Sequence, residues 1–409
     1  MTWPVVPLGE VAATALGKML DRGRTKGHPY VPYLRNVNVQ WGRIDTHDLL
    51  TMEMADEDRE RFAVREGDLL VCEGGEIGRC AIWQGRSDYL AFQKALHRVR
   101  PGDALDARFL RYVLEHHARN GALAKLATGS TIAHLPQQQL RRVPVPLPTV
   151  EEQRRIVDLL EDHLSRLNAA DEYVRTARLR LKRMIKSILV DLIPDVADYP
   201  ESWQRVTVVD AGSVELGRQR HPDWHRGPNM KPYLRVANVF EDRIDTDDVM
   251  TMHWPDATFD RFRLHPGDVL LNEGQTPDLL GRPAIYRGDP PEAAFTNSLM
   301  RFRAHDGVLP EFALLVFRRH MHAGRFKREA RITTNIAHLS ASRLKPVEFP
   351  IPPIEDQERI VATATERLDA VKLLEIEVLR ANRRMPALRR TLLAEAFSGR
   401  LTQSHMAIT

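Results

Sequence analysis

The stretch Pro32-Tyr33-Leu34-Arg35 returns 200 residues later as Pro232-Tyr233-Leu234-Arg235. Further along the chain, Ile132-Ala133-His134-Leu135 returns as Ile336-Ala337-His338-Leu339 at an offset of 204, so the second copy carries a few additional loop residues. Two copies with so long a period are duplicated domains rather than the short units of a solenoid. The sequence therefore predicts two domains of the same fold.

Each copy begins with about 150 residues of mixed character, in which short apolar runs alternate with Gly, Pro and Asn. Such runs occupy residues 68–72 and 140–147, and they predict strands. Helical apolar spacing covers residues 106–127, with a counterpart at 311–325. The pattern predicts an α+β fold with two globular mixed α/β domains in tandem.

A long helix is expected at the end of each copy, over residues 149–192 and from 353 to about 398. Thr149 and Glu152 are spaced for a capping box at the first, and Pro194 lies just beyond its end. Each helix has an apolar stripe that requires a packing partner, either its own domain or the other helix. About 44 residues would extend past a single domain, which favours a helix pair. The stripes contain Leu160, Leu164, Leu167, Val174, Leu181, Ile185, Ile188 and Leu192 in the first helix, and Leu368, Val371, Val378, Met385, Leu388 and Leu392 in the second.

The charge distribution along these helices favours antiparallel pairing. Residues 151–173 contain seven acidic and three basic side chains, whereas 174–192 contain six basic side chains and one acidic. The second helix repeats these numbers over 355–377 and 378–400. Antiparallel helices would place each acidic half beside a basic half, although the same order also suits each helix dipole. Pro386 removes a backbone donor, so a kink or break is expected there.

Composition excludes several classes of protein but selects none. The chain has 409 residues, a net charge of +4 and two cysteines. No apolar run approaches the roughly 20 residues of a membrane span and Met1 opens no signal peptide, so a cytoplasmic protein is expected. Cys72 and Cys80 are expected to be reduced packing residues. Helices of about 44 residues span roughly 66 Å, which suits a two-headed binder of an extended, anionic partner such as about 20 base pairs of DNA.

Across essentially its whole length the sequence resembles the specificity subunit of type I restriction-modification systems. No single motif is specific for this family, but the order of the motifs along the chain is specific for it. The matching motifs are Tyr33-Leu34-Arg35 with Asn38-Val39, Tyr233-Leu234-Arg235 with Asn238-Val239, Pro146-Leu147-Pro148 before Glu151-Glu152-Gln153, Pro350-Ile351-Pro352 before Glu355-Asp356-Gln357, and Ala396-Phe397-Ser398-Gly399-Arg400-Leu401-Thr402.

This resemblance implies two target-recognition domains, at 1–148 and 194–352, separated by conserved spacer helices at 149–193 and 353–402 that form an antiparallel coiled coil. It also implies a non-catalytic, sequence-specific DNA-binding subunit that reads a bipartite target in double-stranded DNA, one half-site per domain. The helices would set the gap, and they would dock two modification (methyltransferase) subunits and two restriction (translocase) subunits. S-adenosylmethionine, ATP and Mg would bind those partners, and no cofactor or metal is expected in this chain.

Comparison of the two copies suggests which residues contact DNA. Positions that differ within a shared frame can read different half-sites, whereas shared basic residues can contact phosphates. A surface role or an ion pair remains the alternative for each. The candidates are Arg35, Asn38, Gln40, Trp41, Arg43, Arg79, Lys94, Thr128, Gly129, Ser130 and Thr131 in the first copy, and Arg235, Asn238, Arg243, Arg282, Asn297, Thr333, Thr334 and Asn335 in the second. The candidates for partner docking on the helices are Glu152, Gln153, Leu160, Leu164, Leu167, Gln357, Leu368 and Val371.

Enzymatic alternatives lack essential parts. Asp68 and Glu73 have a nuclease-like separation, repeated at Asp268 and Glu273, but no lysine follows two residues beyond the glutamate. The chain contains no phosphate-binding loop ending in Gly-Lys-Ser or Gly-Lys-Thr, and no Asn-Pro-Pro-Tyr motif of amino-methyltransferases. The remaining alternatives are a coiled-coil scaffold that does not read bases and, less favoured, a nuclease with an unfamiliar site.

Overall fold

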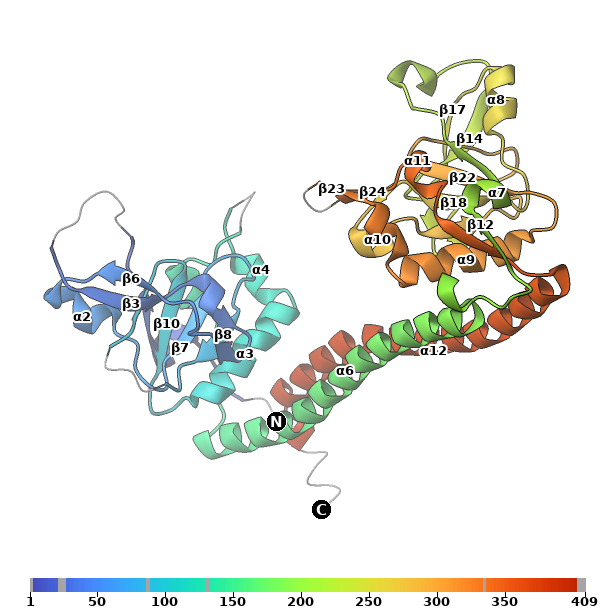
Figure 1. Cartoon of the computed structure of the whole chain (residues 1–409). Coiled ribbons are helices and arrows are strands. Elements are labelled where there is room, and N and C mark those ends of the chain that lie inside the picture. Colours follow the sequence, from blue (N-terminus) through green and yellow to red (C-terminus); the bar gives the residue numbers. More distant parts are fainter. Residues whose placement is uncertain (1–2, 21–26, 86–88, 130–132, 334–335, 403–409) are drawn as a thin grey trace. The chain divides into compact units, whose positions relative to one another are not determined.

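The computed structural model describes residues 3–20, 27–85, 89–129, 133–333 and 336–402, and it divides into two compact units. The first unit contains residues 1–174 and 380–409, and the second contains residues 175–379 (Figure 1). The two long helices α6 (Val150–Leu192) and α12 (Ile354–Phe397) therefore each contribute one half to each unit. None of the helices in the described part of the chain combines the length and apolar character that a membrane span requires.

The first unit is built around a four-stranded antiparallel sheet in the order β2-β10-β7-β8, beside a three-stranded sheet in the order β6-β3-β9. Its strands are β1 (Val5–Pro7), β2 (Ala12–Leu16), β3 (Tyr30–Leu34), β4 (Val39–Gln40), β5 (Arg43–Ile44), β6 (Leu50–Glu53), β7 (Leu69–Cys72), β8 (Cys80–Ile82), β9 (Ala91–Phe92), β10 (Leu96–Pro101) and β11 (Pro144–Pro146). Its shorter helices are α1 (Leu8–Val11), α2 (Asp56–Phe62), α3 (Ala107–Arg119), α4 (Ala122–Leu126) and α5 (Gln137–Leu140).

The second unit repeats this plan, with a four-stranded sheet in the order β13-β22-β18-β20 and a three-stranded sheet in the order β17-β14-β21. Its strands are β12 (Gln204–Thr207), β13 (Gly212–Leu216), β14 (Met230–Leu234), β15 (Val239–Phe240), β16 (Arg243–Ile244), β17 (Met250–His253), β18 (Val269–Asn272), β19 (Gly274–Gln275), β20 (Pro283–Ile285), β21 (Ala294–Phe295), β22 (Leu299–Ala304), β23 (Arg331–Thr333), β24 (Ile336–His338) and β25 (Glu348–Ile351). Its shorter helices are α7 (Val208–Ala211), α8 (Asp256–Phe262), α9 (Pro310–His322), α10 (Arg325–Glu329) and α11 (Ala341–Leu344).

The central strand β7 separates two apolar clusters in the first unit because its side chains alternate between the faces of the sheet. Leu69 and Val71 face the cluster that α3 covers, whereas Leu70 and Cys72 face the other cluster. Cys80 belongs to the first cluster, so the two cysteines point to opposite faces, and both are free and buried. Burial raises the pKa of Cys72 to about 11, which agrees with a packing role.

The α6 and α12 helices pack antiparallel within each unit. In the first unit, Leu160 and Leu164 of α6 share a core with Leu393 and Ala396, which lie near the end of α12. In the second unit, the later residues of α6, including Leu181 and Ile188, share a core with Ile360 and Ala364 near the start of α12. The pairing buries or half-buries the residues of the two apolar stripes except Leu388, which stays exposed. It confirms the predicted fold class of two mixed α/β domains with a paired antiparallel helix spacer.

Two helix predictions need correction. The chain does not break at Pro386, because α12 continues through it to Phe397. The helix predicted over residues 106–127 is divided, since Gly121 adopts a φ of 82° between α3 and α4, and Gly324 does the same between α9 and α10 with a φ of 70°. A left-handed residue cannot continue a right-handed helix. At the start of α6, Thr149 Oγ1 accepts a hydrogen bond from the Glu152 N–H at 3.3 Å, as the capping motif predicts.

Candidate nucleic-acid interface

In the first unit, two of the predicted DNA-contacting segments lie on either side of Glu73. The Glu73 N–H donates to the Ala95 carbonyl at 3.0 Å, beside Lys94, and the Glu73 carbonyl accepts from the Leu135 N–H at 2.7 Å. Thr128 and His134 close the loop between them with two backbone hydrogen bonds of 2.8 Å. Lys94, Thr128 and Gly129 are exposed. The turn that carries Lys94 and the loop at 128–134 therefore belong to one edge of the unit, although they are more than thirty residues apart.

The second unit builds the same edge around Glu273. Its N–H donates to the Ser298 carbonyl at 3.0 Å, beside the exposed Asn297, and its carbonyl accepts from the Leu339 N–H at 2.8 Å. The loop that corresponds to 128–134 is here a hairpin of β23 and β24, to which β19 adds a third strand. We name these two edges, formed around Glu73 and Glu273, the recognition rims.

Several members of the two predicted loop segments cannot be placed on the rims. Ser130 and Thr131 of the first copy, and Thr334 and Asn335 of the second, lie outside the described residues. The backbone of Thr333 pairs with Ile336 in the β23–β24 hairpin, but its side chain is not described.

The β4–β5 hairpin carries Gln40, Trp41 and Arg43 and adjoins the same edge of the first unit. The Trp41 indole N–H donates to Glu76 Oε1 at 2.6 Å, and the Arg119 guanidinium lies 5.6 Å from the Trp41 ring. Gln40 donates to the Val37 carbonyl at 2.9 Å, whereas Arg43 is exposed. These contacts hold the hairpin beside the turn that follows Glu73.

In the second unit, the equivalent β15–β16 hairpin has different chemistry. The guanidinium groups of Arg243 and Arg282 lie 4.5 and 4.7 Å from the Phe240 ring. Glu241 accepts from Arg318 Nε at 2.8 Å and lies 2.9 Å from His322 Nε2. Burial opposes ionisation of this carboxyl, but its hydrogen bonds with His322 and Arg318 and the charge of Arg318 hold its pKa at about 2. The two hairpins thus share a backbone frame and present different side chains.

Four residues shared by both copies are engaged in holding the frame. Asn38 is 2% exposed, and its amide donates to the carbonyls of Asp45 and Asp48 at 3.0 and 3.2 Å. Asn238 repeats both bonds with Asp245 and Asp248. Arg35 pairs with Asp48 at 2.7 Å, and Arg235 pairs with Asp248. This geometry favours the structural alternative for Asn38, Asn238, Arg35 and Arg235 over direct contact with DNA.

Arg79 is also directed inward. Its Nη2 donates to the Asn36 carbonyl at 3.0 Å, and its side chain is 18% exposed. Its counterpart Arg282 packs on Phe240, and burial lowers its pKa. Both arginines are half-buried, so the exposed candidates on the rims and their adjoining hairpins are Arg43, Lys94, Thr128, Gly129, Arg243 and Asn297. Arg243 also pairs with Asp245 at 2.8 Å, although its side chain stays exposed.

Most of the predicted partner-docking residues pack inside their own unit. Gln153 is fully buried and its amide joins the Asp106 N–H to the carbonyls of Ala104 and Pro148. Gln357 makes the equivalent bonds to Leu309, Gly307 and Pro352. The apolar members are core residues or pack against a core, and none of them presents an open surface. These are Leu160, Leu164, Leu167, Leu368 and Val371.

The two aspartates that suggested a nuclease are already paired with arginines. Asp68 is 1% exposed and accepts from Arg100 Nε and Nη2 at 2.7 and 2.8 Å. Asp268 makes the same bidentate pair with Arg303. Among the residues that the structure describes, no group of three or more His, Cys, Asp or Glu side chains could hold a metal ion.

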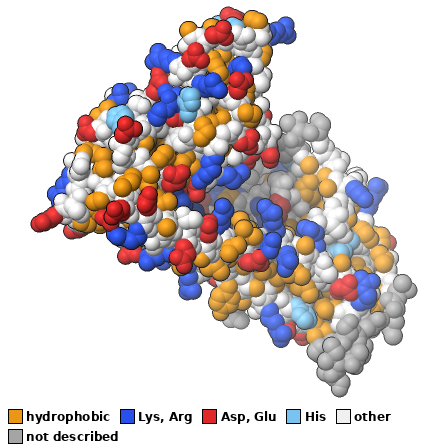
Figure 2. All heavy atoms as spheres, turned by 90° about the vertical axis from the view of Figure 1, so that its right-hand side faces the viewer, with side chains coloured by type: hydrophobic (Ala, Val, Ile, Leu, Met, Phe, Trp, Pro, Cys, Tyr) orange, Lys and Arg blue, Asp and Glu red, His pale blue; other side chains and the backbone are white. Residues whose placement is uncertain are grey.

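Charge alone does not locate the interface. On the face drawn in Figure 2, lysine and arginine side chains are interspersed with aspartate and glutamate. The organising residue of each rim, Glu73 or Glu273, acts mainly through its backbone. Sequence reasoning considered these glutamates only as possible metal ligands, because a role carried by backbone groups leaves no residue-type signal.

His97 is a further residue that the sequence did not single out. It is fully buried on β10, and its Nε2 lies 2.8 Å from the Leu135 carbonyl, at the end of the rim loop. Burial lowers the pKa of His97, so the neutral ring donates to that carbonyl. The second copy has Met300 at the equivalent position of β22. The difference between His97 and Met300 was the only feature of the sequence that could have drawn attention to His97.

Comparison with known protein families identifies a match over most of the chain. The family model described as "Type I restriction modification DNA specificity domain" matches residues 1–173 and again 200–377. The chain is 19% identical over 418 residues to the type I restriction enzyme EcoKI specificity subunit of Escherichia coli (strain K12), covering 98% of this chain and 89% of that protein. It is also 19% identical over 421 residues to the StySPI specificity subunit of Salmonella potsdam, with the same coverage.

Two solved structures share the fold over nearly the full length. One comes from work on complex assembly and conformational transition of the type I R-M system, and it matches with a TM-score of 0.77 at 18% identity over 98% of both chains. The other is the HsdS subunit from Thermoanaerobacter tengcongensis, with a TM-score of 0.54 at 18% identity over 97% of both chains. These likenesses concern the arrangement of two mixed domains and two long helices.

Proposed function

Because this chain belongs to the family of specificity subunits of type I restriction-modification enzymes, which are non-catalytic, we propose that it reads a bipartite sequence in double-stranded DNA. Each recognition rim contacts one half-site. The rims carry the base-reading residues on turns and hairpins, where side chains can enter a groove. The two half-sites differ in sequence because the exposed rim residues differ between the copies.

The observation that carries this proposal is the pairing of one frame with two sets of side chains. Glu73 and Glu273 make equivalent backbone hydrogen bonds. The exposed residue beside them is Lys94 in the first rim and Asn297 at the equivalent position of the second. A lysine at a base edge donates to guanine acceptors, whereas an asparagine both donates to and accepts from adenine. Ser130 and Thr131 of the first copy and Thr333, Thr334 and Asn335 of the second remain predicted DNA contacts.

We also propose that α6 and α12 set the distance between the half-sites. Their 43 and 44 residues correspond to about 65 Å of helix. In this proposal the recognition domains are residues 1–148 and 194–352. The spacers that set the distance are residues 149–193 and 353–402. The outward faces of the spacers dock two modification and two restriction subunits, and these partners bind S-adenosylmethionine, ATP and Mg. Glu152, which is half-buried in the first turn of α6, remains a candidate for docking.

Selection from a random duplex library tests the proposal. The full chain, assembled with its modification subunits, is incubated with the library, and the bound DNA is sequenced. We expect a motif of two unlike half-sites with a fixed gap. An assembled complex that enriches no motif would contradict the proposal and favour a scaffold that joins proteins without reading bases.

Two matched variants assign the half-sites. Lys94→Ala should relax the bases recovered in one half-site, and Asn297→Ala should relax those in the other, because each side chain belongs to a different unit. Each loss of a good base contact costs about 1–3 kcal/mol of discrimination. If both variants altered the same half-site, the assignment of one rim to each half-site would be wrong.

A further inference from the structure

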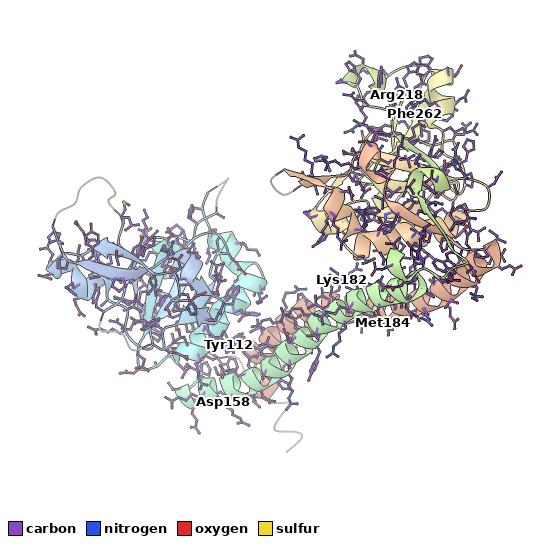
Figure 3. All side chains as sticks on the ribbon, in the orientation of Figure 1. Tyr112, Asp158, Lys182, Met184, Arg218 and Phe262 are labelled. Carbon is purple, nitrogen blue, oxygen red and sulfur yellow. The ribbon has the colours of Figure 1, made fainter. Side chains whose placement is uncertain are left out.

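Arg218 lies at the start of a basic segment in the second unit, between β13 and β14. This segment, residues 217–229, contains Arg218, Arg220 and Arg226 and a single carboxylate, Asp223. We name it the basic arm. The Arg218 guanidinium lies 3.6 Å from the centre of the Trp224 ring and 5.0 Å from that of Trp254, and its Nη1 donates to the His253 carbonyl at 2.9 Å. The Trp254 ring also lies 6.1 Å from that of Phe262 of α8, and Figure 3 labels Arg218 and Phe262.

The guanidinium of Arg218 is held in place without a counter-charge. Within the described part of the chain, no carboxylate oxygen lies within 4.0 Å of it. Stacking on tryptophan stabilises a cation but does not neutralise it. Burial lowers the pKa of Arg218 from its ordinary value, yet an arginine stays charged at neutral pH. The remaining N–H groups therefore favour an anionic acceptor.

The first copy differs at this point. Lys18 takes the position of Arg218, and it forms an ion pair with Asp58 of α2. Thr258 replaces that carboxylate in the second copy, and Trp254 replaces Met54. The same place in the fold thus holds a neutralised cation in one unit and an uncompensated, stacked cation in the other. A purely structural role would be served by the ion pair that the first copy already has.

The basic arm also begins next to the recognition rim. The Asn297 N–H donates to the Arg218 carbonyl at 3.0 Å, and the Arg218 N–H donates to the Phe295 carbonyl at 3.2 Å. Asn297 is the exposed residue to which the proposed function assigns base contact. A duplex that reaches Asn297 would pass close to the start of the arm, where phosphates flank the bases being read.

We infer that the basic arm binds the DNA backbone beside the second half-site, with Arg218 as a phosphate contact and Trp224 as the residue that positions it. This inference rests on the proposed function. Arginine donates to phosphate oxygens in a bidentate geometry, and a guanidinium fixed by stacking loses little side-chain freedom on binding. The contact strengthens binding to all sequences alike and carries no base specificity.

The test measures how the affinity of the complex for duplex DNA depends on salt. The complex of the full chain with its modification subunits is titrated with a labelled duplex between about 50 and 200 mM KCl. Arg218→Gln should weaken binding about tenfold at the lower salt concentration. It should also reduce the slope of log K against log salt by about 0.9, the value for one phosphate contact. The selected motif should stay the same.

Three variants separate this role from a structural one. Arg205→Gln removes the same charge from an exposed position on β12 and should change neither the affinity nor the slope. Arg218→Lys retains the charge and should recover the slope, which a folding defect would not allow. Trp224→Ala should weaken binding while the charge remains.

Two outcomes would overturn the inference. One is an Arg218→Gln complex with the affinity and salt slope of the parent. The other is a change in the bases recovered at the second half-site, since that would make Arg218 a base reader. If the parent complex selects no motif, the proposed function fails, but the same titration on a random-sequence duplex still decides whether Arg218 contacts phosphate.

Discussion

His117 and His320 occupy equivalent positions on α3 and α9 and make the same contact. His117 Nε2 lies 2.8 Å from the Pro144 carbonyl on β11, and His320 Nε2 lies 2.9 Å from the Glu348 carbonyl on β25. Burial lowers the pKa of both, that of His320 to about 4. Each neutral ring therefore donates to the strand that leads into a long helix.

The low pKa of His320 predicts an acid-sensitive second unit. An unfolded histidine titrates near 6.5, so the stabilisation by neutral His320 is complete above that pH. It is lost as the pH falls toward about 4. Between pH 7.5 and 5 we expect a loss of about 2 kcal/mol from this residue. His320→Gln, whose amide can donate to the same carbonyl without titrating, should lose correspondingly less in urea unfolding.

The exposed His225 offers a matched control for this measurement. His225→Gln should follow the parent at both pH values. Equal pH dependence of the parent and His320→Gln would show that protonation of His320 is not coupled to unfolding.

The contact between α3 and α12 contains a buried ion pair. Glu115 is fully buried and accepts from Arg389 Nε and Arg119 Nε, both at 2.7 Å. These hydrogen bonds, with the charges of Arg389 and Arg119, overcome the effect of burial and lower the pKa of Glu115. At the position equivalent to Arg389, α6 has Ile185, which belongs to the apolar core of the second unit. Arg318 takes the position of Glu115 in α9 and pairs with Glu241 at 2.8 Å, so the second unit does not repeat this ion pair between the two helices.

Replacing Arg389 alone should therefore lower the free energy of unfolding more than replacing Arg389 and Glu115 together. Arg389→Ile leaves Glu115 buried with weaker compensation, and we expect about 3 kcal/mol of destabilisation. Adding Glu115→Leu should restore most of that loss, because an apolar pair of similar size fills the site. Unfolding by urea of the single and double variants gives the coupling energy. Strictly additive effects would mean that the two side chains do not interact.

At the scale of the whole molecule, the length of the two helices should determine the gap in the DNA target. Removing seven residues from the middle of both α6 and α12 shortens each helix by about 10 Å. The two turns removed nearly preserve which faces meet. The gap in the selected motif should then contract by about three base pairs.

Shortening only one helix is the control for this prediction. The antiparallel stripes would then no longer match along their length, so the chain should lose stability rather than select a shorter gap. A pair of shortened helices that retained the original gap would show that something other than the helices sets the spacing.

The sequence alone determined the duplication, the two long helices and their antiparallel pairing. The repeat is recognisable because local motifs such as Tyr33-Leu34-Arg35 recur in the second copy. The long helices are recognisable because apolar and charged periodicity depends only on residues a few positions apart. The helix expected from 353 to about 398 is present, and no break occurs at Pro386 because one lost backbone bond does not end a packed helix.

Only the tertiary structure decided which candidates occupy the surface. Gln153 has the side chain of a binding residue, but its amide donates to the carbonyl of Ala104, which lies far away along the chain. Glu73 joins Ala95 to Leu135 through its backbone. Lys18 pairs with Asp58, whereas the equivalent Arg218 has Thr258 at that place and no carboxylate partner among the residues that the structure describes. Sequence periodicity reports the neighbours along the chain, whereas burial and pairing depend on neighbours that only folding brings together.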